Sequence, residues 1–286
     1  MEFQEDIKNL VKVSLLASIS LGYCYSVGKI ISKGPLSAPS IPLFRFLSLA
    51  CFPIGKSIPG KNPTHRSPLN YGIKALLLTT FLKVYHDHGD HMNPMIAWIF
   101  FAFSLYFFLD LLMTISSIVM EFLLGVKLDP QFDEPYLSTS LQDFWGRRWN
   151  IMVNRILHPT IYNPVRTMSA RAIGHMWAPI PAILTTFAVS GLMHELIFFY
   201  FTRDWPTWDT MLFFCLHGVS LVMETTIKKF VNVKWSLPRH ITAPLVVAFV
   251  LVTSYWLFFP ELRRCKLVER AFEDYGAIAK IVTFVV

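Results

Sequence analysis

Residues 187–201 read FAVSGLMHELIFFYF, and this stretch decides the fold class because it places two titratable side chains, His194 and Glu195, inside an apolar run. The run extends over Ala178–Phe201, which is long enough as a helix to cross a bilayer core of about 30 Å. A strand or loop at that depth would leave backbone groups unpaired, so a helix is expected. Titratable residues inside a membrane are costly and usually face a cavity or a partner. We therefore predict a membrane-spanning helix with a functional site at His194, although a structural histidine bonding a neighbouring helix also fits this pattern.

The overall composition supports membrane residence. Hydrophobic residues make up 53% of the 286 residues, charged residues make up 16%, and the mean hydropathy is +0.45. These values are too apolar for an ordinary soluble domain. The formal net charge is +7, but Lys and Arg fall between apolar runs rather than on one soluble face, so we expect the lipid bilayer as a partner and no nucleic acid. The four cysteines are isolated and predict neither a disulfide framework nor a metal site.

Apolar runs of sufficient length predict an all-α, polytopic integral membrane protein with about six to eight transmembrane helices. The predicted spans are Leu10–Val27, Leu69–Tyr85, Met95–Leu124, Ala178–Phe201, Trp208–Ile227 and Ile241–Phe259. The shorter run Ile41–Ile54 contains Arg45 and Pro53, so we expect it to be interfacial or buried. Acidic residues near Met1 argue against a cleavable signal peptide, and the first run is predicted to be retained.

Basic residues concentrate in the loops 55–68, 125–177 and 228–240, which fall on one side of the membrane if Ile41–Ile54 does not span it. The positive-inside rule places this side in the cytosol. Arg263 and Arg264 would then lie on the lumenal side, against the rule.

The polar segment 129–177 is predicted to be an amphipathic cytosolic insertion, and residues 140–166 within it read SLQDFWGRRWNIMVNRILHPTIYNPVR. Within Asp143–Leu157, apolar side chains recur at helical spacing, which predicts one helix along the membrane surface. These side chains are Phe144, Trp145, Trp149, Met152 and Ile156. An interfacial anchor explains this periodicity as well as a functional site does, and the polar residues Gln142 and Asn150 favour the site.

The motif SLQDFWGRRWN, residues 140–150, followed by SGLMHEL, residues 190–196, resembles the membrane-bound O-acyltransferase superfamily and, within it, the plant wax synthase branch. The resemblance implies a single domain over 1–286, with N-terminal spans in 1–128, the insertion in 129–177 and C-terminal spans in 178–286. It also implies a multi-pass protein of the endoplasmic reticulum that transfers an acyl group from acyl-coenzyme A to a lipid alcohol. The acceptor is expected to be a long-chain alcohol, with a sterol or diacylglycerol as alternatives. Acyl-coenzyme A is a substrate, so no cofactor is expected.

The resemblance further implies that His194 and Asn150 are the catalytic pair. Imidazole titrates near neutral pH and suits the general base that takes the acceptor's proton, while the amide of Asn150 suits an oxyanion donor. Supporting roles are predicted for Glu195, Gln142, Trp145 and Trp149. The phosphates of acyl-coenzyme A predict basic partners, for which the candidates are Arg147, Arg148 and Arg155.

Two other classes of protein fit parts of the sequence. The cluster His86, His88 and His91 is a weak metal signal, and a membrane di-iron enzyme would need several such clusters, so we predict no metal. A polytopic transporter would also carry buried His and Glu residues, but it would not need the Trp–Asn segment with a histidine partner. Near the N-terminus, Ser32–Lys33–Gly34 leads directly into PLSAPSIPLFRF, so one or two early spans of the family are predicted to be missing.

Overall fold

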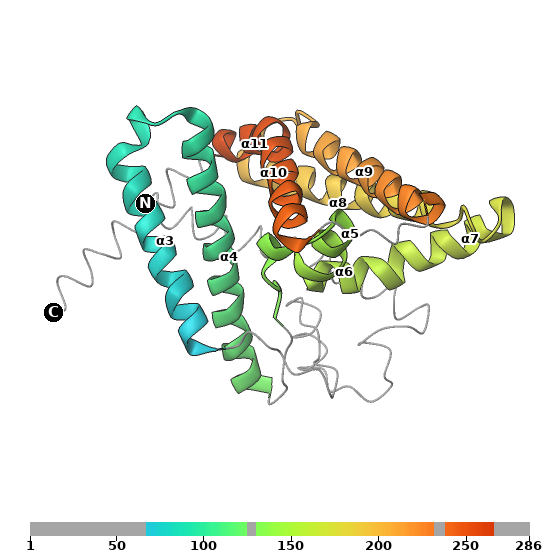
Figure 1. Cartoon of the computed structure of the whole chain (residues 1–286), viewed down its shortest axis with the longest axis horizontal. Helices are drawn as coiled ribbons and strands as arrows, with labels where there is room; N and C mark the ends of the chain where they lie inside the picture. Colours follow the sequence, from blue (N-terminus) through green and yellow to red (C-terminus); the bar gives the residue numbers. More distant parts are fainter. Residues whose placement is uncertain (1–66, 125–129, 232–237, 266–286) are drawn as a thin grey trace.

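The computed structural model describes residues 67–124, 130–231 and 238–265, and the regular elements in these ranges are helical. The predicted segments Leu10–Val27 and Ile41–Ile54 lie outside the described residues. The α-helices, shown in Figure 1, are α3 (Pro68–His88), α4 (Pro94–Leu124), α5 (Leu141–Asp143), α6 (Ile151–Leu157), α7 (Asn163–Ile173), α8 (Pro179–Thr202), α9 (Asp209–Val231), α10 (Arg239–Leu257) and α11 (Phe259–Arg264). Short 3-10 and π turns connect them, including η2 (Pro135–Leu137), η3 (Phe144–Arg148) and η4 (His158–Tyr162).

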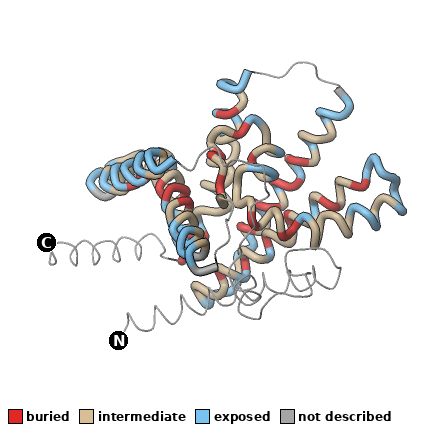
Figure 2. Tube along the Cα trace, turned by 90° about the horizontal axis from the view of Figure 1, so that it is seen from below, coloured by how far each residue is buried: buried red, intermediate tan, exposed pale blue. Residues whose placement is uncertain are grey.

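Among the described helices, four are long and apolar enough to cross a membrane: α4, α8, α9 and α10. The all-α, polytopic membrane fold is thereby confirmed, while the total of six to eight spans stays a prediction. The predicted span Leu69–Tyr85 forms the helix α3, but Lys74 and Lys83 lower its apolar content and it is not among the four. Figure 2 shows buried residues where helices meet and exposed residues on outward sides. The exposed side chains on these helices include Ile115, Leu196 and Trp256, as expected of surfaces in contact with lipid.

Helices α3 and α4 form a hairpin at one end of the molecule (Figure 1). A buried ion pair joins them, because Lys74 Nζ lies 2.6 Å from Asp110 Oδ2. One helical turn from this pair, Leu78 of α3 packs in one cluster with Tyr106 and Phe107 of α4. The same cluster includes Phe132, which connects the hairpin to the segment that precedes α5.

Helices α8 and α9 approach each other closely because glycine lies at their interface. A Cβ atom on Gly191 would lie 2.7 Å from the sulfur of Met211 and 3.2 Å from its Cα, and a Cβ atom on Gly218 would lie 3.0 Å from the Cβ of Phe187. Small residues at helix interfaces permit such close backbone contact in membranes. Gly191 is one turn before His194, so this contact also fixes how deeply His194 lies against α9.

The prediction of one continuous helix over Asp143–Leu157 is wrong. The chain forms the π turn η3, becomes extended at Trp149, and takes a left-handed conformation at Asn150, with φ 42° and ψ 60°. Asn150 then caps α6, since its Oδ1 accepts a hydrogen bond of 3.3 Å from the backbone N–H of Val153. Asparagine tolerates this backbone region and is favoured at helix N-caps, which explains the break.

Two backbone hydrogen bonds hold this break against the preceding loop. The N–H of Asp133 donates to the carbonyl of Arg148 at 3.0 Å, and the N–H of Ile151 donates to the carbonyl of Gln131 at 2.8 Å. The residues between these bonds, Trp149 and Asn150, are thus anchored on both sides.

Candidate functional site

A cavity lies between the membrane helices and the segment around η3. Its walls come from the 135–149 segment and from α4, α8, α9 and α10, the four described helices that can cross the membrane. Most of the lining side chains are apolar or aromatic, among them Trp98, Phe103, Tyr106, Phe144, Trp145, Trp149, Phe213, Phe214, Val247, Leu251 and Phe258. His194 and Ser254 are among the few polar residues in the lining. An apolar pocket with few convergent polar groups is the arrangement expected of a small-molecule site.

His194 projects from α8 into this cavity. Its Nδ1 atom lies 2.8 Å from the backbone carbonyl oxygen of Ser190, one turn earlier. A carbonyl oxygen only accepts, so Nδ1 carries the hydrogen in this contact and Nε2 of the neutral ring keeps its lone pair. The ring is held against Phe214 with centroids 4.5 Å apart and against Phe258 at 5.8 Å. The histidine is therefore oriented by its own helix and by aromatic packing, with a basic nitrogen available.

Trp145 and Trp149, predicted as supporting residues, both line the cavity together with Phe144. The rings of Phe144 and Trp149 stack with centroids 5.5 Å apart, and Trp145 lies edge-on to Phe144 at 5.0 Å. The segment predicted as a surface helix therefore contributes an aromatic wall to the interior, which amphipathic spacing alone did not indicate.

Asn150 and Gln142 lie at the edge of this wall. Asn150 follows Trp149 directly but is not among the cavity-lining residues of the described chain. Its Oδ1 is engaged by Val153, so the Nδ2 hydrogens are the ones suited to donation. Gln142 is exposed. The structure thus brings His194 together with Trp145 and Trp149, and places the two amide side chains outside the lining.

Glu195 points away from the cavity toward the start of α9. Its Oε1 accepts a hydrogen bond of 2.8 Å from the backbone N–H of Met211, and the side chain is buried. The first N–H groups of a helix have no partner within it, and a carboxylate satisfies them well. Glu195 therefore joins α8 to α9, while Ser190 supplies the orienting contact of His194.

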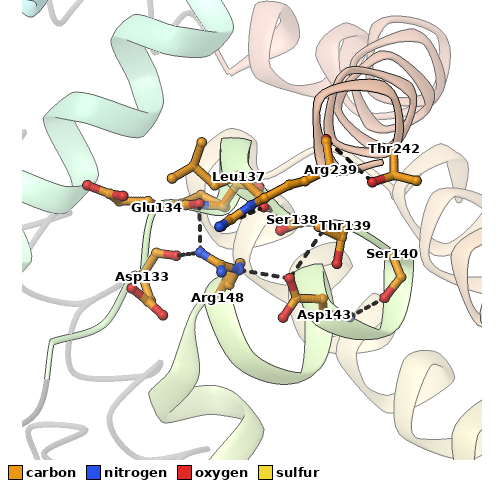
Figure 3. Close-up of polar contacts among 11 residues, drawn as sticks. Asp133, Glu134, Leu137, Ser138, Thr139, Ser140, Asp143, Arg148, Arg239 and Thr242 are labelled. Carbon is orange, nitrogen blue, oxygen red and sulfur yellow. Dashed lines mark hydrogen bonds and ion pairs between the residues drawn. The ribbon is translucent and has the colours of Figure 1, made fainter. Parts of the chain in front are cut away.

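The three candidate arginines have different surroundings. Figure 3 shows that the Arg148 guanidinium lies among groups of its own segment: Nε donates to Asp143 Oδ2 at 2.9 Å, and Nη1 donates to the carbonyl oxygens of Asp133 at 2.8 Å and Glu134 at 3.3 Å. Arg147 is exposed and Arg155 is half-buried. Arg148 thus stabilises the fold of its own segment, and Arg147 is the most exposed of the three.

Residues of α4, α10 and η2 were missed as site residues by the sequence analysis, which had no signal for which faces of these helices meet. The indole N–H of Trp98 donates to the carbonyl of Leu251 at 3.1 Å and so joins α4 to α10. Tyr136 of η2 also lines the cavity. Burial and the nearby Glu134 carboxylate raise the pKa of Tyr136 to about 12, so its phenol stays protonated at neutral pH.

Metal-ligating residues do not gather in the described part of the chain, where no group of three His, Cys, Asp or Glu side chains lies close enough to hold an ion.

The fold and cavity define the class of protein: an integral membrane protein with an apolar pocket among those of its described helices that can span the membrane. Residues 128–216 match the sequence profile described as the Membrane bound O-acyl transferase family. The chain is 40% identical over 257 residues to acyl-CoA–sterol O-acyltransferase 1 of Arabidopsis thaliana, covering 87% of this chain and 74% of the relative. It is 39% identical over 252 residues to the long-chain-alcohol O-fatty-acyltransferase of Simmondsia chinensis, covering 85% and 71%. It is 34% identical over 328 residues to probable long-chain-alcohol O-fatty-acyltransferase 7 of Arabidopsis thaliana, covering 96% of each chain.

The chain belongs to the membrane-bound O-acyltransferase family, in its plant wax synthase branch, and is an O-acyltransferase. The transporter alternative is therefore set aside. An alignment of 328 residues exceeds the 286 residues of the chain, so that relative contains residues without a counterpart inside the matched region. The absence of early spans stays a prediction.

Proposed function

We propose that the protein transfers a fatty acyl group from acyl-coenzyme A to a long-chain alcohol, giving a wax ester, in the membrane of the endoplasmic reticulum. The observation that carries this proposal is the position of His194, whose Nδ1 is fixed by Ser190 while the ring lines an apolar cavity between spanning helices. Several relatives are named long-chain-alcohol O-fatty-acyltransferases, and these names support a long-chain alcohol as the acceptor. No metal or cofactor enters the proposed reaction.

His194 serves as the general base in this proposal. Its Nε2 takes the proton of the acceptor hydroxyl as the hydroxyl oxygen attacks the thioester carbonyl carbon. The tetrahedral oxyanion then collapses, the carbon–sulfur bond breaks, and the imidazolium returns its proton to the coenzyme A sulfur. The alcohol attacks the thioester directly, without a covalent acyl-enzyme. Both substrates must therefore be bound at the same time.

Asn150 is proposed to stabilise the oxyanion through its Nδ2 hydrogens. The anchoring of Trp149 and Asn150 by backbone bonds to Asp133 and Gln131 supports this role, since a donor fixed before the reaction loses little free energy in reorganising. The exposed Arg147 is proposed to meet the phosphates of acyl-coenzyme A from the cytosolic side. Arg155 stays a second candidate, and the geometry of Arg148 favours a structural role instead.

The aliphatic and aromatic cavity lining fits the alkyl chain of a fatty alcohol, since the burial of methylene groups against apolar side chains is favourable. A sterol is a second candidate acceptor, because a relative that is 40% identical to this chain is named a sterol acyltransferase.

The test is microsomal transfer from labelled acyl-coenzyme A to a panel of fatty alcohols, a sterol and diacylglycerol, with His194→Ala as the comparison. We expect a wax ester that disappears in the variant. A sterol ester would redirect the proposal to the second acceptor. An ester formed equally by His194→Ala would remove His194 from the mechanism.

A further inference from the structure

A second histidine, His217, lies behind the cavity wall on α9, and it is fully buried. Trp145 Nε1 donates to its Nδ1 at 3.1 Å, and its Nε2 lies 2.9 Å from Thr253 Oγ1 on α10. An indole nitrogen only donates, so Nδ1 is the acceptor and Nε2 carries the hydrogen. Thr253 Oγ1 in turn donates to the carbonyl of Phe249 at 2.7 Å. Both ring nitrogens of His217 are thus occupied.

His194 and His217 therefore hold opposite tautomers and differ in what they can do. His194 keeps a lone pair on Nε2, whereas His217 has no free nitrogen to accept a proton from a substrate. His217 is also packed between Phe213 and Phe249, with ring centroids 4.3 Å and 5.0 Å from its own. It lies outside the cavity lining, while Phe213 and Trp145 form part of it.

Trp145 is the cavity-lining residue that forms a hydrogen bond to His217. The indole contacts the rings of Phe187, Phe213 and Phe214 at centroid distances of 5.6, 6.3 and 5.9 Å. Phe214 is the ring against which His194 rests. A rotation of this indole would therefore change both the width of the cavity and the packing next to His194.

The same face of α9 also binds the start of α5, just before η3, through a second hydrogen bond. Glu224, two turns after His217, accepts a hydrogen bond of 2.7 Å from the backbone N–H of Leu141 at the start of α5. Helix α9 thus binds both Leu141, at the start of α5, and the indole of Trp145 in η3.

We propose that His217 is a positioning residue that fixes the rotamer of Trp145, and that this contact sets which alcohol chain lengths the cavity accepts. This inference rests on the proposed function, in which the cavity holds the reacting chains. Without the bond, the indole N–H has to seek another acceptor and the wall next to His194 is no longer fixed.

The experiment measures ester formation across fatty alcohols of increasing length in His217→Leu and His217→Gln. Glutamine offers an amide oxygen to Trp145 and an amide N–H to Thr253, whereas leucine offers neither. We expect His217→Leu to lower kcat/KM for the preferred alcohol about tenfold and to change the ratio between long and short alcohols, and His217→Gln to restore most of both. Ser220→Ala is the matched control and should behave as the wild type, because Ser220 of α9 lies outside the cavity lining and donates to the carbonyl of Leu216 in its own helix.

A double-variant comparison tests whether His217 acts through Trp145. Trp145→Phe removes the indole N–H, so adding His217→Leu in that background should change the length ratio little further. Thr253→Val provides a milder loss if His217→Leu does not accumulate in membranes. The proposal is overturned if the ratio of kcat/KM between long and short alcohols is the same in His217→Leu as in the wild type. It is also overturned if ester formation from all alcohols falls in proportion to the amount of folded protein and does not recover in His217→Gln. Independent effects of His217→Leu and Trp145→Phe on this ratio would overturn it as well. Failure of the proposed function is recognised separately, because the wild type itself would then form no wax ester from any of the fatty alcohols.

Discussion

The Nδ1 atom of His194 lies 2.8 Å from the carbonyl oxygen of Ser190, four residues earlier on the same helix. Ordinary helical geometry places that carbonyl within reach of the ring, so no partner from a second segment is required to select the tautomer. The adjacent Glu195 uses its carboxylate to satisfy the start of α9 instead. His194 thus faces the cavity while Glu195 contacts α9, because the side chains of adjacent helical residues point about 100° apart.

Replacing His194 by Gln should lower the turnover of acyl transfer about 100- to 10,000-fold, since the amide fills similar space but cannot take a proton. Turnover is measured with saturating acyl-coenzyme A and alcohol in microsomes that contain equal amounts of folded protein. His175→Gln is the control, because His175 is exposed and lies outside the cavity. Turnover of His194→Gln within a few-fold of wild type would contradict the base role.

Glu195→Gln should preserve folding and activity, whereas Glu195→Leu should lower the free energy of unfolding by about 1–3 kcal/mol, because the N–H of Met211 loses its buried acceptor. The thermal unfolding of the purified protein in detergent checks this difference. If Glu195→Gln lost turnover while remaining stable, the carboxylate would have a chemical role that its position at α9 does not explain.

Gly191→Ala should separate α8 from α9, since the added Cβ would lie 2.7 Å from the sulfur of Met211 and 3.2 Å from its Cα. We expect a loss of about 1–3 kcal/mol in unfolding free energy, together with lower turnover because His194 is one turn away. Gly72→Ala is the matched control on α3, where a Cβ would meet nothing within 4 Å. Equal melting temperatures for the two variants would show that the interface adapts without cost.

Arg147→Gln should raise the KM for acyl-coenzyme A several-fold while leaving stability unchanged, because its guanidinium is exposed. Arg148→Gln should lower the unfolding free energy by about 1–3 kcal/mol through the loss of its bonds to Asp143, Asp133 and Glu134. KM is measured at low and moderate salt, since an exposed phosphate contact weakens with ionic strength. The reverse pattern would assign the phosphates to Arg148.

Hydropathy was sufficient to predict the long helices. The predicted runs Met95–Leu124 and Ala178–Phe201 correspond closely to α4, Pro94–Leu124, and α8, Pro179–Thr202. The bilayer imposes both the length and the helical form of such segments, so composition alone is informative. The inward position of His194 also followed from its cost in an apolar run.

The 140–157 segment could not be predicted in the same way. Its apolar residues recur at helical spacing, but the spacing does not reveal the π turn at Phe144–Arg148 or the left-handed Asn150. Only the preference of asparagine for N-cap positions signalled the break. The bond between Trp145 and His217 joins residues 72 positions apart, and no local pattern determines which faces of two distant segments meet.

The apolar lining of the cavity also bears on what happens to a thioester beside a base. Water is a competing nucleophile and is abundant in any hydrated site, yet empty space enclosed by aliphatic and aromatic side chains tends to stay dry. His194 would then find few water molecules to activate, and a bound alcohol would be the hydroxyl group nearest to it. In the proposed reaction, the rings that line the cavity would thereby favour ester synthesis over hydrolysis of the acyl donor.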